Sequence, residues 1–513
     1  MKTGEARHKE GDSGSMCSGM RPRGFLVVIF LITMMVIVTA SLRSHSTRSY
    51  GKDSGIASID LSRDAHVRFN SRRNQHNVKD TEIRAAASDI EAFVETTKGH
   101  IRDAMPPSAN RDKLIEMYGK TFMNTVDTTM RATNEGRVFV ITGDINAMWL
   151  RDSAAQVEHY TRFVAPTSRT VRRVIAKVVS EHAFLALMDP YANAFNDPPE
   201  FKDVRANYRR GGYVSTGNYE LDSFAYSTRL AYQLWREAGE TKQFDELFRS
   251  ACRLMMVVWR KEQRHAETTT YRYDKRELRH DGLENSKTGF TGMTWTGFRA
   301  SDDDCKYHYN VPDNMMASVA LRYMREMALE IYDDKPWAEE CAALKHDIDE
   351  GIRRFGIIDD PKHGRVYAYE VDGLGHYILE DDANIPSLLS MPYLNYTEGD
   401  MDVWKRTVDL IWSRDNPWFF SGKVAEGIGS RHTGKGKVWH MSMIMKILVT
   451  DSPQERSRIL LELMASDNNS NLMHEGFDPS NPRRFSRSWF AWANSLFALM
   501  VTELLEKNQL PHV

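Results

Sequence analysis

The chain has 513 residues, with 68 lysines and arginines against 70 aspartates and glutamates, so its formal net charge at pH 7 is −2. Such a balance gives no basic surface of the kind that binds nucleic acid, and we expect no nucleic-acid partner. The four cysteines are too few for a disulfide framework. The one internal bridge that we consider joins Cys252 to Cys341.

The N-terminal part predicts a membrane anchor followed by a stem. Residues 24–42, GFLVVIFLITMMVIVTASL, carry no charge and are long enough to cross a bilayer. Basic residues in 1–23 favour a cytoplasmic tail, and residues 43–81 are polar and aperiodic, as in a flexible stem. We therefore expect a single-pass type II membrane protein of the secretory pathway, placed in the Golgi, with a lumenal catalytic part. Cleavage of the anchor would instead release a secreted form.

Residues 82–513 predict one all-α domain. Apolar residues recur at helical spacing in segment after segment, and strand-like runs are few. Clusters of polar and aromatic residues precede or open alternate helices; they occupy 147–156, 216–223, 301–314, 380–387, 427–440 and 474–494. Six inner helices, each followed by an outer return helix, explain this alternation. The pattern thus predicts an (α/α)6 barrel whose six polar loops meet at one end, with residues 385–394 among the inner helices.

The loop before the third inner helix, residues 291–317, has the most distinctive composition. It combines rings such as Trp295 with the cation Arg299 and the adjacent carboxylates of Asp302, Asp303 and Asp304. Aromatic rings stack on sugars, and paired carboxyl groups cleave glycosidic bonds by acid–base chemistry. Because neighbouring like charges raise the pKa of one member, one of these aspartates has a reason to hold a proton. A solvated or helix-capping cluster is the alternative interpretation of the same run.

The loop before the sixth inner helix supplies a second acidic group. Glu475 follows His474 there, with Arg487 nearby. A closed ring would bring this loop across a pocket from Asp302 and Asp303. Glycosidic cleavage needs such opposed carboxyl groups, one protonated and one ionised.

Several of these segments match a known family in order along the chain. TGDINAMWLRDSAAQ, TGMTWTGFRASDDD, EVDGLGHYILEDDANIPSLLSMPYL, GIGSRHT and HEGFDPSNPRRFSRSWFAWANSLF closely resemble glycoside hydrolase family 125. The resemblance implies an (α/α)6 barrel and an exo-acting α-mannosidase. This enzyme would need neither metal nor cofactor, and would remove non-reducing terminal α-1,6-linked mannose with inversion. The partner would then be a mannose-containing glycan; the oligomeric state is not indicated.

The resemblance also assigns roles to residues. An aspartate of the SDD segment, Asp302 or Asp303, would be the general acid and Glu475 the general base. The family has Pro-Ser before the aspartate pair and Ala after it, whereas this chain has Ala300-Ser301 before and a third carboxylate after it. The residues expected to bind the sugar are Trp149, Arg151, Asp152, Asp222, Trp295, Arg299, Asn314, His432, His474 and Arg487.

Two alternatives share most of these features. A metal-dependent mannosidase of glycan processing has the same anchor and helical barrel, and sensitivity to a chelator distinguishes it. A catalytically silent barrel that binds mannose glycans is the other; the carboxylates present in both motifs argue against it. A glycosyltransferase has the same membrane topology but a different pattern of elements.

Overall fold

The structure is a computed structural model that describes residues 79–197, 212–269, 271 and 287–513. The chain divides into units of residues 1–71 and 72–513, and the described residues all belong to the second unit. The predicted anchor, 24–42, lies outside the described residues and stays a prediction. Within those ranges, none of the helices combines the length and the apolar character needed to span a membrane.

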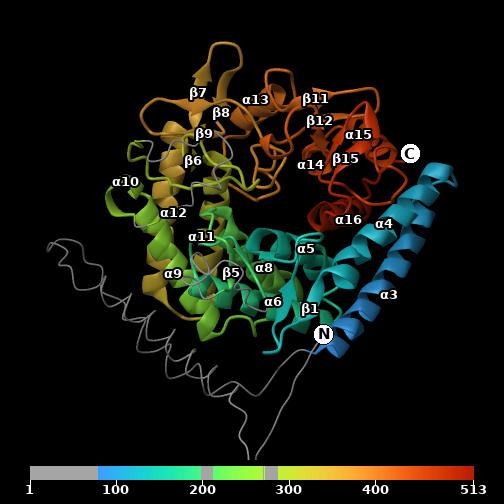
Figure 1. Cartoon of the computed structure of the whole chain (residues 1–513), viewed down its shortest axis with the longest axis horizontal. Helices are drawn as coiled ribbons and strands as arrows, with labels where there is room; N and C mark the ends of the chain where they lie inside the picture. The colour runs from blue at the N-terminus through green and yellow to red at the C-terminus, as the bar shows by residue number, and fades with distance from the viewer. Residues whose placement is uncertain (1–78, 198–211, 270, 272–286) are drawn as a thin grey trace, which may run out of the picture. The chain divides into compact units, whose positions relative to one another are not determined.

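The described unit is a ring of helices (Figure 1). Five helices hold inner positions: α5 (Leu150–Phe163), α8 (Asp222–Ala238), α11 (Val311–Glu330), α14 (His440–Val449) and α16 (Ala491–Glu506). The outer helices are α4 (Ala109–Thr128), α6 (Arg169–Met188), α9 (Glu246–Glu262), α12 (Lys335–Phe355), α13 (Met401–Ile411) and α15 (Pro453–Ala465). Helix α3 (Asp80–Ala104) adds a further layer against α4 and α6, and α10 (His265–Thr268) and the 3-10 helix η2 (Arg431–Thr433) lie in loops.

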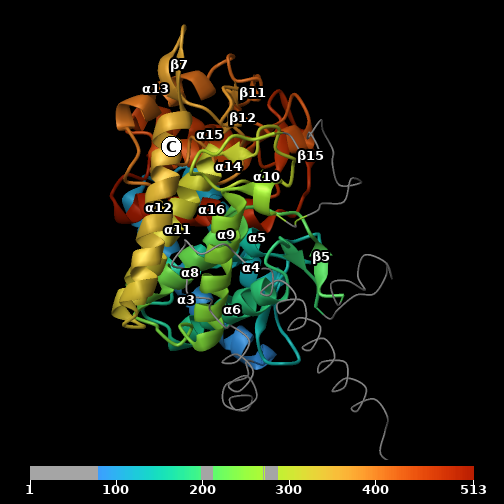
Figure 2. The same ribbon diagram turned by 90° about the vertical axis from the view of Figure 1, so that its left-hand side faces the viewer.

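Burial separates the two sets of helices. Almost every residue of α5 and α16 is buried, whereas α12 and α15 bury one stripe and expose the rest. Neighbouring inner helices pack in order, α11 on α8, α8 on α5, α5 on α16 and α16 on α14. Outer helix α4 also packs on α16, which joins the two ends of the ring (Figures 1 and 2). The predicted alternation of inner and outer helices is therefore present.

The fourth inner position differs from the prediction. The buried residues 381–391 lie between α12 and α13 in chain order, but 385–394 form turns instead of a helix. Pro386 and Pro392 lack the N–H groups that a helix needs. Asp381 accepts backbone hydrogen bonds from Leu388 (2.9 Å) and Leu389 (3.0 Å), which fixes the turn that replaces the helix.

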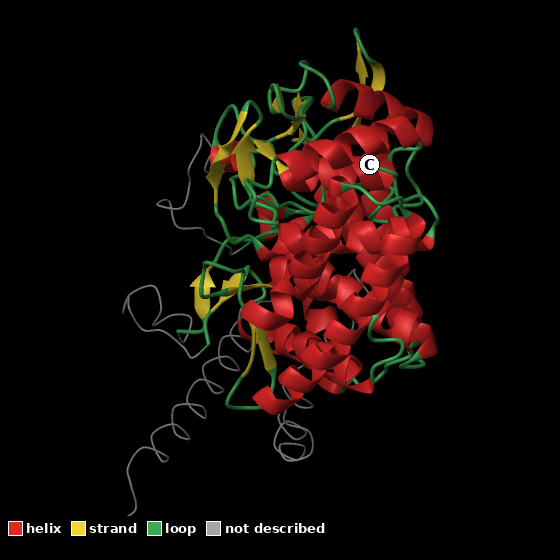
Figure 3. Ribbon diagram, turned by 90° about the vertical axis from the view of Figure 1, so that its right-hand side faces the viewer, coloured by secondary structure: helices red, strands yellow, loops and turns green. Residues whose placement is uncertain are grey.

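Short strands connect the helices, and most lie along one side of the helical body (Figure 3). Three precede inner helices directly: β3 (Met148–Trp149) before α5, β6 (Tyr309–Asn310) before α11 and β13 (Val438–Trp439) before α14. The others are β1 (Met130–Ala132), β2 (Val138–Val140), β4 (Ala194–Phe195), β5 (Val214–Thr216), β7 (Ile357–Asp360), β8 (Gly364–Tyr367), β9 (Glu370–Val371), β10 (Tyr377–Ile378), β11 (Phe419–Ser421), β12 (Glu426–Ile428), β14 (Gly476–Asp478) and β15 (Asn481–Ser486). They form antiparallel sheets of two or three strands, including β3-β4-β5, β10-β9-β6 and β13-β14-β15. These sheets hold the loops that begin the inner helices.

The cysteine prediction is wrong. Cys252 on α9 and Cys341 on α12 are both buried free thiols. The Cys341 thiol instead lies 3.5 Å from the sulfur of Met256. The contact between the two sulfur atoms and the ion pair of Arg253 with Glu340 at 3.7 Å, and not a disulfide, join α9 to α12.

Candidate active site

Arg151, in the first turn of α5, gathers carboxyl groups from two other segments and from its own helix. Its Nη1 lies 2.7 Å from Glu220 Oε2 and 3.4 Å from Asp222 Oδ2. Its Nη2 lies 3.2 Å from Asp302 Oδ1, and its Nε lies 3.4 Å from Asp152 Oδ2. The guanidinium fork suits this because it offers five donors in fixed directions. The start of α5 thereby connects the start of α8 with the loop that precedes α11.

Asp302 is the most exposed carboxylate of this group. Its Oδ1 accepts hydrogen bonds from Trp149 Nε1 (2.9 Å) and Asn193 Nδ2 (3.2 Å) as well as from Arg151. The side chain of Asp302 is 29% exposed, against 2% for Arg151 and 0% for Asp222. Its backbone has φ = 63°, in the left-handed region that aspartate tolerates better than most residues. This turn directs the carboxyl group toward the open side of the cluster.

The carboxyl groups around Arg151 have strongly shifted pKa values. Burial raises the pKa of Asp152 to about 6, against the opposing charge of Arg151. Burial also raises the pKa of Glu220 well above its ordinary value. The pKa of Asp302 shifts in the opposite direction. Burial acts to raise this pKa, but the charge of Arg151 and hydrogen bonds from Glu220 and Trp149 outweigh burial and hold it at about 2. Burial and the charge of Arg151 thus move the pKa values of neighbouring carboxyl groups in opposite directions.

The side chain of Asp303 makes different contacts from that of Asp302. Its side chain is 0% exposed, and its Oδ1 lies 3.6 Å from Nδ1 of His432. Burial lowers the pKa of His432, but the hydrogen bond with Asp303 and the charges of Asp302, Asp303 and Glu475 outweigh it and raise that pKa above 6.5. The imidazole of His432 thus lies between the acidic loop before α11 and the one before α16.

Glu475 is held by an ion pair with Arg487. Its Oε1 lies 3.4 Å from Nη1 of Arg487, whose Nη2 also contacts Asp144 Oδ1 at 2.5 Å. The side chain of Glu475 is 5% exposed. Glu475 and Asp302 both act electrostatically on His432, so the structure brings together the two acidic loops that the sequence places about 170 positions apart.

Four residues that the sequence predicted to bind sugar lie in packed surroundings. Arg299 is 0% exposed and pairs with Glu370 (2.6 Å) and Glu380 (3.0 Å). Trp295 is 2% exposed and stacks on the rings of His265 and His308.

Asn314 is bonded on both ends of its amide to backbone groups of Thr294 and Asn310, and His474 stacks on Phe485 at 3.9 Å. These four side chains pack against neighbouring residues and stabilise the loops. A sugar could contact them directly only if the residues that cover them moved away.

The sequence analysis missed two residues of the central cluster. Glu220 stands two positions before Asp222, and Asn193 precedes β4 in a loop with no distinctive motif. Asn193 Nδ2 donates to Glu220 Oε1 at 2.8 Å and to Asp302 Oδ1 at 3.2 Å. The adjacency of Glu220 to the predicted Asp222 was a usable signal. Nothing local marks Asn193, because its role depends on how distant loops meet.

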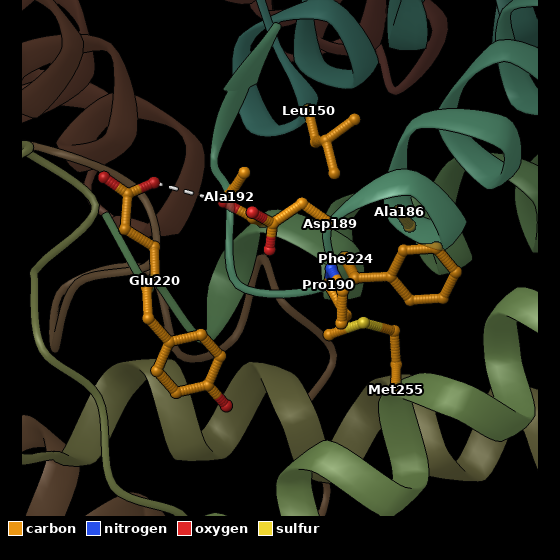
Figure 4. A pocket seen from close by; sticks show the side chains of 10 residues that line it. Leu150, Ala186, Asp189, Pro190, Ala192, Glu220, Phe224 and Met255 are labelled. Carbon is orange, nitrogen blue, oxygen red and sulfur yellow. Dashed lines mark hydrogen bonds between the residues drawn. The ribbon is translucent and has the colours of Figure 1, made fainter. Parts of the chain in front are cut away.

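A small cavity borders Glu220 on the side toward the helices (Figure 4). Its volume is about 10 Å³, and Leu150, Phe224 and Met255 are among its lining residues. That is room for about one water molecule, so this cavity is no sugar site. Over the described ranges, no group of three or more histidine, cysteine, aspartate or glutamate side chains is arranged to hold a metal ion.

The fold is shared with glycosidases of distant sequence. A bacterial glucoamylase complexed with acarbose matches with a TM-score of 0.51 at 11% identity, over 78% of this chain and 56% of that chain. A glycosidase in complex with glucose matches with a TM-score of 0.51 at 10% identity, over 78% of this chain and 99% of that one. At such low identity these matches define the class of fold, a glycosidase-type helical barrel.

The sequence family is more specific. Residues 111–502 match the family of metal-independent alpha-mannosidases (GH125), and the chain belongs to this family. A metal-independent alpha-mannosidase of Streptococcus pneumoniae, solved as a non-productive complex with alpha-1,6-mannobiose, is 36% identical with a TM-score of 0.75. That match covers 81% of this chain and 98% of the other. The meiotically up-regulated gene 157 protein of Schizosaccharomyces pombe is 33% identical over 461 residues, 83% of this chain and 87% of the relative. The predicted family is therefore confirmed.

Proposed function

We propose that this protein is an exo-acting, inverting α-mannosidase that hydrolyses non-reducing terminal α-1,6-linked mannose from glycans. The observation that carries the proposal is the position of His432: its Nδ1 lies 3.6 Å from Asp303, the neighbour of Asp302, and, against the effect of burial, the charges of both Asp302 and Glu475 raise its pKa. Support for the linkage comes from the solved S. pneumoniae relative, which binds alpha-1,6-mannobiose. Inversion requires carboxyl groups far enough apart to admit a water molecule between base and sugar.

In this proposal Asp302 protonates the departing oxygen and Glu475 deprotonates the attacking water. Asp302 is preferred to Asp303 because its side chain is 29% exposed, whereas that of Asp303 is 0% exposed and faces His432. Arg487 holds Glu475 in place through the contact at 3.4 Å. Trp149 and Asp152 would bind the terminal mannose. Arg151 and Asp222, whose side chains are 2% and 0% exposed, would support the cluster without touching the sugar.

The test is a panel of mannobioses that differ only in linkage. Wild-type protein is incubated with the α-1,6, α-1,3 and α-1,2 isomers, and the anomer released first is identified by NMR. We expect turnover of the α-1,6 isomer with β-mannose as the initial product. Initial release of α-mannose would contradict inversion, and preferred turnover of another isomer would contradict the linkage.

We also propose that residues 24–42 anchor the protein in a membrane of the secretory pathway, with the barrel lumenal. Residues 24–42 are uncharged and long enough to cross a bilayer, which agrees with an anchor. Asn395 and Asn468, the acceptor residues of two N-glycosylation sequons, are exposed, which agrees with a lumenal barrel. Alkaline extraction and protease protection of the full chain in cells test it. Release of the full-length protein by alkali, or digestion of the barrel in intact vesicles, would contradict the topology.

A further inference from the structure

Two shared donors hold the carboxyl groups of Glu220 and Asp302 side by side. Arg151 donates to Glu220 Oε2 and Asp302 Oδ1, and Asn193 Nδ2 donates to Glu220 Oε1 and Asp302 Oδ1. The proposed mechanism does not yet use this pair. Carboxyl groups held together in this way can hydrogen-bond to each other when one of them holds a proton. The side chain of Glu220 is 0% exposed, whereas that of Asp302 is 29% exposed.

We propose that Glu220 and Asp302 share one proton and act together as the general acid, with Glu220 as a positioning residue that holds the proton and Asp302 as the residue that delivers it. This inference rests on the proposed function. It explains how Asp302 can serve as an acid although its Oδ1 accepts three hydrogen bonds, an environment that favours the ionised form. The proton is stored on the buried partner, where ionisation is least favourable.

The charges around the pair agree with a stored proton. Arg151 and Asp152 face it from α5, Asp222 and Ser223 from α8, and His432 acts electrostatically on Asp302 from the loop before α14. Asp313, at the start of α11, acts electrostatically on Asp222 and Arg151. Carboxyl groups thus outnumber the single buried guanidinium at the centre. Like charges so close cannot all be ionised, as in other carboxyl dyads that share one proton.

The proton of the pair moves to Asp302 and from there to the glycosidic oxygen, as the bond between that oxygen and the anomeric carbon breaks. The attacking water forms the new bond to carbon and gives its proton to Glu475. The pair is left doubly ionised beside Arg151, and it regains one proton from solvent while Glu475 loses one.

The test compares two substrates on the same protein, Glu220→Gln in the full chain. Hydrolysis of α-1,6-mannobiose needs a proton on the departing oxygen, whereas the phenolate of 2,4-dinitrophenyl α-mannoside leaves without one. We expect kcat to fall about 100-fold or more on the disaccharide and less than about 10-fold on the aryl mannoside. The ratio of the two rates is independent of how much protein is folded.

A matched control is Asp313→Asn, which removes another carboxyl group of the cluster. It should reduce both rates by the same factor. Glutamine imitates a protonated Glu220, so the melting temperature of Glu220→Gln should stay close to that of wild type. Equal losses on the two substrates, or a variant that fails to fold, would mean that Glu220 is an ionised structural partner of Arg151 and would overturn the inference alone. A wild-type protein inactive on both substrates would overturn the proposed function as well.

Discussion

The indole Nε1 of Trp149 donates a 2.9 Å hydrogen bond to Oδ1 of Asp302, across 153 positions of sequence. Trp149 ends β3 at the start of α5, and Asp302 lies in the loop before α11. One short contact therefore ties the orientation of the proposed acid to a different inner helix. The geometry of this site is consequently a property of the closed ring and not of any one loop.

Replacing Glu475 by glutamine should abolish turnover while sugar binding remains. The amide keeps the shape of the side chain but cannot take a proton from water, and we expect kcat to fall about 100-fold to 10,000-fold. Mannobiose hydrolysis and calorimetric titration with mannobiose measure the two effects. Glu339→Gln, at an exposed position of α12, is the matched control. Near-normal turnover in Glu475→Gln would remove this residue from the mechanism.

Asparagine at position 302 should affect catalysis differently from asparagine at position 303. Asp302→Asn should lose activity on mannobiose and keep most of it on 2,4-dinitrophenyl α-mannoside, because only the first substrate needs an acid. Asp303→Asn should reduce both rates together, since Asp303 contacts His432. Rates of the two variants on both substrates decide the assignment. The reverse pattern would make Asp303 the acid.

Asp152→Asn should stabilise the protein above pH 6. The pKa of Asp152 is about 6 in the folded protein against an ordinary value of 3.8, so the folded state binds the proton more tightly than the unfolded one. Protonation of Asp152 contributes its full amount to the free energy of unfolding below pH 3.8, and this contribution is lost as the pH rises to 6. Above pH 6 the free energy of unfolding is therefore lower by up to about 3 kcal/mol. Urea unfolding at pH 4 and pH 8 measures the difference, and a variant that gained no stability at pH 8 would contradict the argument.

Treatment with a chelator should leave activity unchanged. The family is metal-independent, and the proposed chemistry uses Asp302 and Glu475 without a Lewis acid. Mannobiose hydrolysis before and after dialysis against EDTA provides the measurement. A loss that zinc or calcium restored would favour the metal-dependent alternative.

The ring of helices could be predicted because burial imposes the same alternation on sequence and structure. Inner helices are apolar on all sides, as in α16, and outer helices are apolar on one stripe. The fourth inner position could not be predicted this way: its apolar residues are buried as expected, but Pro386 and Pro392 and the hydrogen bonds of Asp381 select turns. The spacing of apolar residues in the sequence predicts which segments are buried better than it predicts their backbone conformation.

The site could be predicted where a motif carried the signal, and less well elsewhere. Arg151 and Asp302 lie in conspicuous motifs and are in contact at 3.2 Å, and Glu475 acts electrostatically on the same histidine as Asp302. Arg299 and Trp295 have the composition of sugar-binding residues, yet ion pairs and stacked rings enclose them. Glu220 had one signal, its position two residues before Asp222, and Asn193 had none. The role of Asn193 comes from contacts between loops, which spacing along the chain does not encode.

The packing of α4 on α16 has a consequence for biosynthesis. Thr125 Oγ1 lies 3.0 Å from Ser495 Oγ, and Tyr118 OH lies 3.1 Å from Thr502 Oγ1. Trp492, in the first turn of α16, also places its ring 5.8 Å from the guanidinium of Arg151. A nascent chain can form these contacts only after α16 has emerged from the ribosome. Until then the carboxyl groups around Arg151 lack the contact with Trp492, so an intermediate from which α16 has not emerged should be devoid of mannosidase activity.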